Sequence, residues 1–96
     1  MNKKTSLLLL FILSSMTYFG QKTVKGIVKD TYGNLLPGVS ILIKGTTLGA
    51  VSGFDGDYTI KIPMNKNTLI FSYLGMEPKE VNVDDKTEIN VFLEPA

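Results

Sequence analysis

The chain has 96 residues, enough for one domain, and it contains no cysteine, histidine, tryptophan or arginine. These absences exclude disulfide bonds, cysteine nucleophiles, histidine bases and the common zinc sites. Ten lysines are balanced by nine acidic residues, so the chain has neither a basic field for nucleic acid nor a polybasic patch for membranes.

The first twenty residues differ in composition from the rest of the chain. Lys3 and Lys4 precede an uninterrupted apolar run, 7–13, and small polar residues follow it. This order is typical of a cleavable secretory signal peptide, and the apolar run is far shorter than the roughly 20 residues of a transmembrane helix. We therefore expect a signal peptide over 1–20 and an exported domain over 21–96, with the exact cleavage point left open.

In the exported part, apolar and polar residues alternate with a period of two, which is the side-chain period of a β-strand. Turn-forming residues interrupt the alternation about every 8–12 residues, as in β-sandwiches. The pattern predicts seven short strands, in chain order over 23–30, 39–44, 49–53, 58–63, 69–74, 80–84 and 89–94. With no sustained helical period, these strands favour an all-β sandwich.

The alternation also predicts which side chains are buried. Ile41 and Ile43 share the inward face of the second strand, and the almost wholly apolar fifth strand favours a central position in its sheet. We expect Tyr58, together with Phe71 or Tyr73, to pack in the core rather than to form a platform for carbohydrate.

Three large apolar side chains fall at outward positions. Ile27, Leu42 and Phe92 alternate with predicted core residues and are therefore expected on the surface. Together they would form an apolar contact surface for another protein, and an unpaired sheet edge is the alternative contact surface. Scattered apolar side chains with no binding role would show the same pattern, so the alternation alone leaves this choice open.

The polar residues that could carry chemistry lack the partners that each reaction needs. Asp30, Asp55 and Asp57 lie in predicted turns, but a calcium loop needs further acidic ligands and a late glutamate. The hydroxyl of Ser52 has no histidine to activate it. We therefore expect a turn role for these acids, with no catalytic residue, no metal site and no cofactor.

A covalent cross-link between strands is one further reaction to consider. Lys25 or Lys29 in the first strand and Asn90 in the last strand are broadly placed for a lysine–asparagine isopeptide bond. That reaction needs a buried pair beside a carboxylic acid, whereas the alternation directs all three side chains outward. We therefore expect no such bond.

Four short motifs occur in order: Leu-Pro-Gly-Val at 36–39, Lys-Gly-Thr at 44–46, Asp-Gly-Asp-Tyr at 55–58 and Phe-Ser-Tyr-Leu-Gly at 71–75. With these motifs the sequence resembles the carboxypeptidase-regulatory-like domain, a transthyretin/prealbumin-like sandwich. More narrowly, it resembles the copy at the N-terminus of SusC/RagA-type TonB-linked outer-membrane receptors of Bacteroidetes. The resemblance implies a seven-stranded antiparallel β-sandwich with Greek-key topology.

The resemblance also implies a location and a role. It predicts a non-catalytic interaction or structural module of the periplasm and outer membrane, whose partner is an outer-membrane receptor or a component of the TonB system, and not nucleic acid. A carbohydrate-binding module is the alternative function. The sequence ends at Ala96 without a plug or a barrel, and a transmembrane barrel needs about eight strands of about ten residues. We therefore expect a truncated receptor or a stand-alone module.

Overall fold

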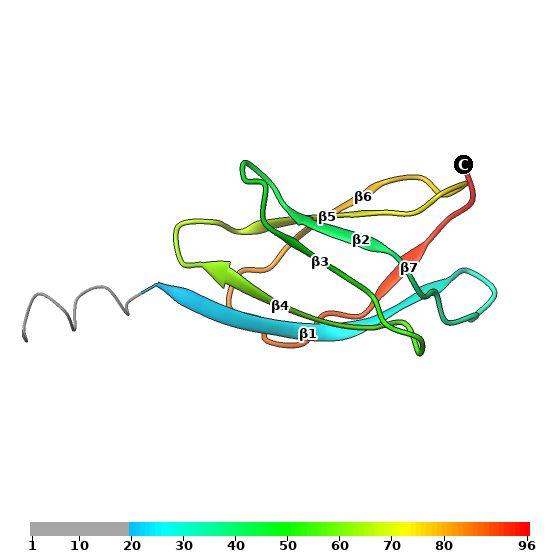
Figure 1. The fold of residues 1–96 in the computed structure, drawn as a ribbon, viewed down its shortest axis with the longest axis horizontal. Coiled ribbons are helices and arrows are strands. Elements are labelled where there is room, and N and C mark those ends of the chain that lie inside the picture. Colours follow the sequence, from blue (N-terminus) through cyan, green and yellow to red (C-terminus); the bar gives the residue numbers. More distant parts are fainter. Residues whose placement is uncertain (1–19) are drawn as a thin grey trace, which may run out of the picture.

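The computed structural model describes residues 20–96, which form seven strands and no helix (Figure 1). In chain order the strands are β1 (Gln21–Asp30), β2 (Ser40–Ile43), β3 (Gly49–Val51), β4 (Asp57–Pro63), β5 (Thr68–Ser72), β6 (Lys79–Asn82) and β7 (Val91–Leu93). This part of the chain has no helix that is long and apolar enough to cross a membrane. The predicted signal peptide lies outside the described residues, except for Gly20, and stays a prediction.

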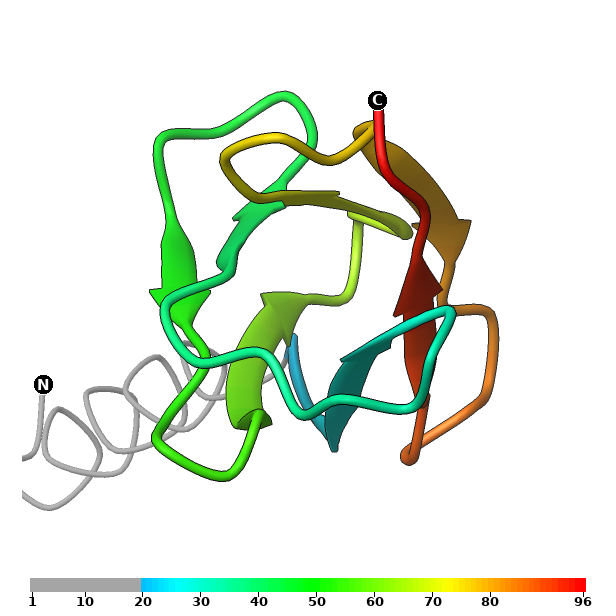
Figure 2. The same cartoon turned by 90° about the vertical axis from the view of Figure 1, so that its right-hand side faces the viewer.

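The strands form two sheets that face each other across the core (Figures 1 and 2). One sheet has three strands in the order β4-β1-β7, and the other has four strands in the order β3-β2-β5-β6. β5 lies between β2 and β6, so the central position that its apolar run predicts is confirmed. The predicted β-sandwich is therefore confirmed as well.

Apolar side chains from alternate strand positions fill the space between the sheets. In β2, Ile41 and Ile43 are buried while the residues beside them are exposed, as the alternation predicts. Tyr58 and Phe71 meet edge to face in the core, with ring centroids 5.4 Å apart and an interplanar angle of 78°. The most deeply buried large side chains are Phe71, Ile41, Ile43, Ile62, Leu69, Leu93, Val24, Val28, Val39 and Val83.

One strand pairing differs from the all-antiparallel arrangement that we expected, because β1 and β7 run parallel. The reason lies at the end of the sandwich where β1 begins. There Lys22, near the start of β1, donates a hydrogen bond from its ammonium group to the carbonyl of Asp84, which follows the end of β6. The chain crosses from β6 to the other sheet at this end, so β7 leaves it in the same direction as β1.

β5 is shorter than the predicted strand over 69–74. It ends at Ser72, and Leu74 is 96% exposed in the turn that follows. The N–H of Met76 donates to the carbonyl of Tyr73 at 3.0 Å, and Gly75 adopts a φ of 80° in the left-handed region. This turn reverses the chain before the apolar run is complete.

Hydrogen bonds join the two sheets along the side where β6 and β7 lie. The N–H of Glu77 donates to the carbonyl of Glu94 at 2.8 Å. Lys79 of β6 extends its ammonium group to the carbonyl of Phe92 in β7, at 3.3 Å. These contacts connect the edge strands of the two sheets and place a charged side chain against the backbone of β7.

Candidate contact surface

Two of the three predicted contact residues lie together on the outer face of the three-stranded sheet. Ile27 of β1 and Phe92 of β7 line a hollow of about 180 Å³ with Lys29, Asn90 and Val91. Ile27 is 38% exposed and Phe92 is 51% exposed. A second hollow, of about 370 Å³, shares Ile27 and Asn90 and continues over β4. We call the area of these two hollows the β1–β7 surface.

Leu42, the third predicted contact residue, lies on the other sheet. Its cross-strand neighbours are Gly49 of β3 and Ile70 of β5. It is 37% exposed on the outer face of that sheet. Because the outer faces of a sandwich point in opposite directions, Leu42 does not join the β1–β7 surface. The alternation places a residue outward but says nothing about which sheet it belongs to.

The ladder between β1 and the last strand is interrupted beneath the β1–β7 surface. The carbonyl of Lys25 accepts the N–H of Ile89 at 2.9 Å, as in a regular parallel ladder. The next bond of such a ladder would join the N–H of Ile27 to the carbonyl of Ile89. Instead, the N–H of Ile27 donates to Oδ1 of Asn90 at 3.0 Å. The Ile89 carbonyl is diverted, because it accepts the hydroxyl of Tyr58.

A glycine opposite Ile89 makes this diversion sterically feasible. A Cβ at Gly26 would lie 1.8 Å from the Ile89 oxygen and 3.0 Å from a ring carbon of Tyr58. The carbonyl occupies the space of the missing side chain and meets the Tyr58 hydroxyl at 2.5 Å. Because the Ile89 carbonyl leaves the ladder, β7 begins at Val91 and is shorter than predicted. The only signal in the sequence is a glycine within a strand.

Burial also affects the acidity of Tyr58, which is 3% exposed. It raises the pKa of Tyr58 to about 12, because the phenolate would lose its contact with water. The hydroxyl therefore stays protonated over the whole neutral range. As a protonated group it can donate to the Ile89 carbonyl, so the contact joins β4 to the segment before β7 within the three-stranded side of the sandwich.

The carboxylate of Asp30 caps the turn after β1. One of its oxygens accepts the N–H groups of Tyr32 and Asn34, both at 2.9 Å, and the other accepts the side-chain amide of Asn34 at 3.0 Å. These bonds, those from Asn34 above all, hold the pKa of Asp30 below its ordinary value of 3.8. Asp55 and Asp57 are exposed around another turn. Within the described part of the chain, no three acidic side chains gather as metal ligands would.

Two further polar candidates are engaged by the backbone. Ser52 is 5% exposed, and its hydroxyl accepts the N–H of Val39 at 2.8 Å and donates to the carbonyl of Leu36 at 2.7 Å. The hydroxyl thus braces the loop before β2. Asn90 accepts an N–H of β1 through its side chain, and both Asn90 and Lys25 are exposed. A buried lysine–asparagine pair, which an isopeptide bond needs, is not formed by these two residues.

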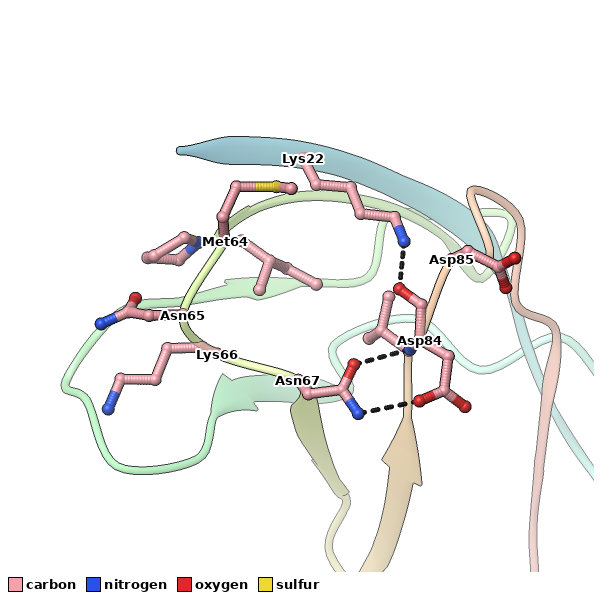
Figure 3. Close-up of a pocket in the computed structure, with 10 residues that line it drawn as sticks. Lys22, Met64, Asn65, Lys66, Asn67, Asp84 and Asp85 are labelled. Atoms are coloured by element: carbon pink, nitrogen blue, oxygen red, sulfur yellow. Dashed lines mark hydrogen bonds between the residues drawn. The ribbon is translucent and has the colours of Figure 1, made fainter. Parts of the chain in front are cut away.

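A hollow of about 400 Å³ lies at the end of the sandwich where β1 begins (Figure 3). Asn67 and Asp84 form a reciprocal pair beside it. Asn67 donates its side-chain amide to the Asp84 carboxylate at 3.0 Å and accepts the Asp84 N–H at 2.6 Å. Asp84 has a φ of 53°, a left-handed conformation that aspartate tolerates. Together with the bond from Lys22, this pair braces the ends of β1, β5 and β6, a role that the sequence analysis missed.

Comparison with known proteins agrees with this architecture. Residues 24–96 match the family model of the CarboxypepD_reg-like domain. The chain belongs to this family. The match begins within β1 and continues beyond β7, so the CarboxypepD_reg-like domain includes most of β1 and the whole of the other six strands.

This CarboxypepD_reg-like domain is also similar to parts of much longer proteins. The chain is 40% identical over 92 residues to the TonB-dependent receptor P3 of Formosa agariphila, which corresponds to 93% of the chain and 9% of the receptor. It is 36% identical over 94 residues to the TonB-dependent receptor SusC of Bacteroides thetaiotaomicron, or 97% of the chain and 9% of the receptor. The chain thus spans about a tenth of the length of these relatives.

A solved structure shows the same fold at low sequence identity. A chain in a mutant type II cohesin–X-dockerin complex from Acetivibrio cellulolyticus superposes with a TM-score of 0.52 and 19% identity. The superposition covers 74% of the present chain and 52% of the chain in that complex. At this identity the likeness concerns the fold alone.

Proposed function

We propose that this CarboxypepD_reg-like domain is a non-catalytic protein-interaction module of the periplasm. The observation that carries the proposal is its match to the receptors, since nearly the whole chain aligns with 9% of each TonB-dependent receptor. We infer that a part of that size serves these receptors as an accessory domain. The partner that we propose is an outer-membrane receptor or a component of the TonB system.

The non-catalytic role is supported by what the polar side chains already do. The Asp30 carboxylate is engaged in its turn, and the Ser52 hydroxyl holds two backbone groups. The Tyr58 hydroxyl is buried against a carbonyl, where it cannot reach a substrate. The chain also contains no histidine or cysteine. Asp30, Ser52 and Tyr58 thus stabilise the fold, and the exposed faces of the sheets are left for contacts with other proteins.

The β1–β7 surface is the contact surface that we propose. Ile27 and Phe92 are large, apolar and partly exposed, and they line one hollow on the outer face of the three-stranded sheet. Lys29 at the same hollow adds a charged rim to the apolar pair. An apolar centre with a polar rim is the usual composition of a protein interface. Carbohydrate platforms need neighbouring aromatic rings, whereas the exposed rings of Tyr32 and Phe54 lie on different turns.

Site-specific photo-crosslinking tests this proposal. A benzophenone amino acid replaces Phe92 in one variant and Leu74 in a control variant, and both are expressed in cells with an intact envelope. Leu74 is 96% exposed and therefore at least as accessible as Phe92. We expect position 92, and not position 74, to form an adduct that mass spectrometry identifies as an outer-membrane receptor or a TonB-system protein. Equal adducts at both positions, or none at position 92, would contradict the proposal.

Calorimetry distinguishes the alternative function. The purified protein is titrated with oligosaccharides, and the variants Ile27→Ser and Phe92→Ser are titrated in parallel. We expect no heat of binding from any of the three. Saturable heat that Phe92→Ser abolishes would assign the β1–β7 surface to carbohydrate instead.

A further inference from the structure

β3 is an edge strand without any charge to protect it. It ends the four-stranded sheet, with β2 as its neighbour on one side. The ten residues 45–54, which contain β3 and its flanks, include no charged side chain. Leu48 is 56% exposed and Val51 is 67% exposed. Edge strands in natural proteins usually carry charges, prolines or bulges that prevent pairing with another chain.

The other edge strands of residues 20–96 carry such protection. β6, at the far edge of the same sheet, contains Lys79 and Glu80. β4, at an edge of the other sheet, contains Asp57 and Lys61 and ends on a proline. At β7 the ammonium group of Lys79 donates a hydrogen bond to the carbonyl of Phe92, so a charge lies against this edge. β3 therefore differs from every other edge strand in the described structure.

The register of β3 directs two of its residues toward the open side. The N–H of Ile43 donates to the carbonyl of Leu48, and the N–H of Ser52 donates to the carbonyl of Val39. In an antiparallel ladder the bonded residues alternate, so Ala50 also directs its backbone groups toward β2. The backbone N–H and C=O groups of the two residues between, 49 and 51, point away from β2. Figure 2 shows β3, in green, at the margin of its sheet. No further strand is hydrogen-bonded to it there, and the chain turns after β3 and continues as β4 of the other sheet.

We propose that two copies of this chain pair through β3, antiparallel, about a two-fold axis at Ala50. Gly49 of one copy then lies opposite Val51 of the other, and each of these pairs exchanges two backbone hydrogen bonds. The Val51 side chain lies over the glycine, beside Leu42, because Leu42 is the cross-strand neighbour of Gly49 within each copy. The two four-stranded sheets become one continuous sheet of eight strands.

A second copy fits this edge for three reasons. The uncharged segment 45–54 brings no like charges together at the axis. The small Gly49 and the larger Val51 are complementary to each other in the register that pairs these two residues. Pairing one strand with itself also closes the assembly as a dimer, since the opposite edge, β6, is charged and cannot continue the sheet into a filament.

Sedimentation of the purified protein alone tests the dimer. Because no other protein is present, a failure to form the dimer would not bear on the proposed function above. Wild type and the variants Val51→Lys and Leu74→Lys are compared up to about 1 mM, the range of weak association. We expect a dimer that Val51→Lys weakens by about tenfold or more, because two lysines approach the axis. Leu74→Lys makes the same kind of change at an exposed site, 96% accessible, away from β3 and leaves the dimer intact. A wild-type monomer at all concentrations, or equal effects of the two variants, would overturn the proposal.

Hydrogen exchange on the wild type provides a readout that does not depend on a variant. We expect the amides of Gly49 and Val51 to become protected as the protein concentration rises, while the already bonded amide of Ser52 changes little. A dimer that leaves the first two amides unprotected would place the interface elsewhere and overturn the proposal. Protection that appears only when another envelope protein is added would assign the edge to that protein.

Discussion

Replacing Gly26 by alanine tests whether the diverted carbonyl of Ile89 stabilises the fold. The new Cβ would lie 1.8 Å from the Ile89 oxygen and 2.6 Å from the Ile89 carbonyl carbon, so this backbone has to move. The move breaks the bond from Tyr58 and leaves a buried hydroxyl unpaired, at a cost of about 1–3 kcal/mol. Overpacking adds about 1–3 kcal/mol. We therefore expect Gly26→Ala to lower the free energy of unfolding by about 3–5 kcal/mol, a large share of the roughly 4–11 kcal/mol typical for this size.

Urea denaturation measured by circular dichroism gives the free energies. The variants are Gly26→Ala, Tyr58→Phe and the double variant. Tyr58→Phe alone leaves the Ile89 carbonyl without its donor and is expected to cost about 1–2 kcal/mol. If the alanine already breaks the bond, Tyr58→Phe costs less than about 0.5 kcal/mol in the Gly26→Ala background, since the two changes remove one interaction.

Gly53→Ala is the matched control. A Cβ at Gly53 would approach Asp57 Oδ1 at 2.8 Å, but that carboxylate is the end of an exposed, flexible side chain that can turn away. We expect this variant to change the free energy of unfolding by less than about 1 kcal/mol. Equal costs of Gly26→Ala and Gly53→Ala, or simply additive effects of Gly26→Ala and Tyr58→Phe, would refute a stabilising role of the diverted Ile89 carbonyl.

Three further outcomes follow from the buried polar groups. Ser52→Ala leaves two backbone groups unpaired and should lower the free energy of unfolding in urea by about 2–3 kcal/mol, whereas the exposed Thr59→Ala should stay within about 0.5 kcal/mol. The lowered pKa of Asp30 means that its contribution is complete above pH 3.8 and is lost as the pH falls through the lowered value. Asp30→Asn should therefore flatten the acid end of a stability–pH curve, and an unchanged curve would contradict this role. The pKa of Tyr58, raised from 10.0 to about 12, means that its contribution is complete below pH 10 and is lost as the pH rises toward 12. Alkaline unfolding followed by far-ultraviolet circular dichroism should lose this dependence in Tyr58→Phe.

The strands could be predicted from the sequence because burial imposes the period of two. The alternation around Ile41 and Ile43 identified both the strand and its inward face. It also placed Ile27, Leu42 and Phe92 outward, and all three are exposed to a third or more. The pattern could not divide these three between the two sheets, since sheet membership depends on pairings between residues far apart in sequence.

The hydrogen bonds beneath the β1–β7 surface could not be predicted from the sequence for a different reason. The alternation describes side chains, whereas the Ile89 carbonyl is a backbone group whose partner is the hydroxyl of Tyr58. The replacement of that carbonyl by the Asn90 side chain has no pattern of its own. Asp30 shows the same limit, because its place in a turn was predictable but its burial and its three hydrogen bonds were not.

The parallel pairing of β1 with β7 has a consequence for how the polypeptide reaches its native state. β1 is the first strand to be synthesised and the central strand of its sheet, yet one of its two neighbours, 91–93, is the last to be made. The partners Val28 and Val91 are separated by most of the domain's sequence, and contacts between such distant residues slow folding. A nascent chain can therefore complete its three-stranded sheet only after β7 has emerged from the ribosome.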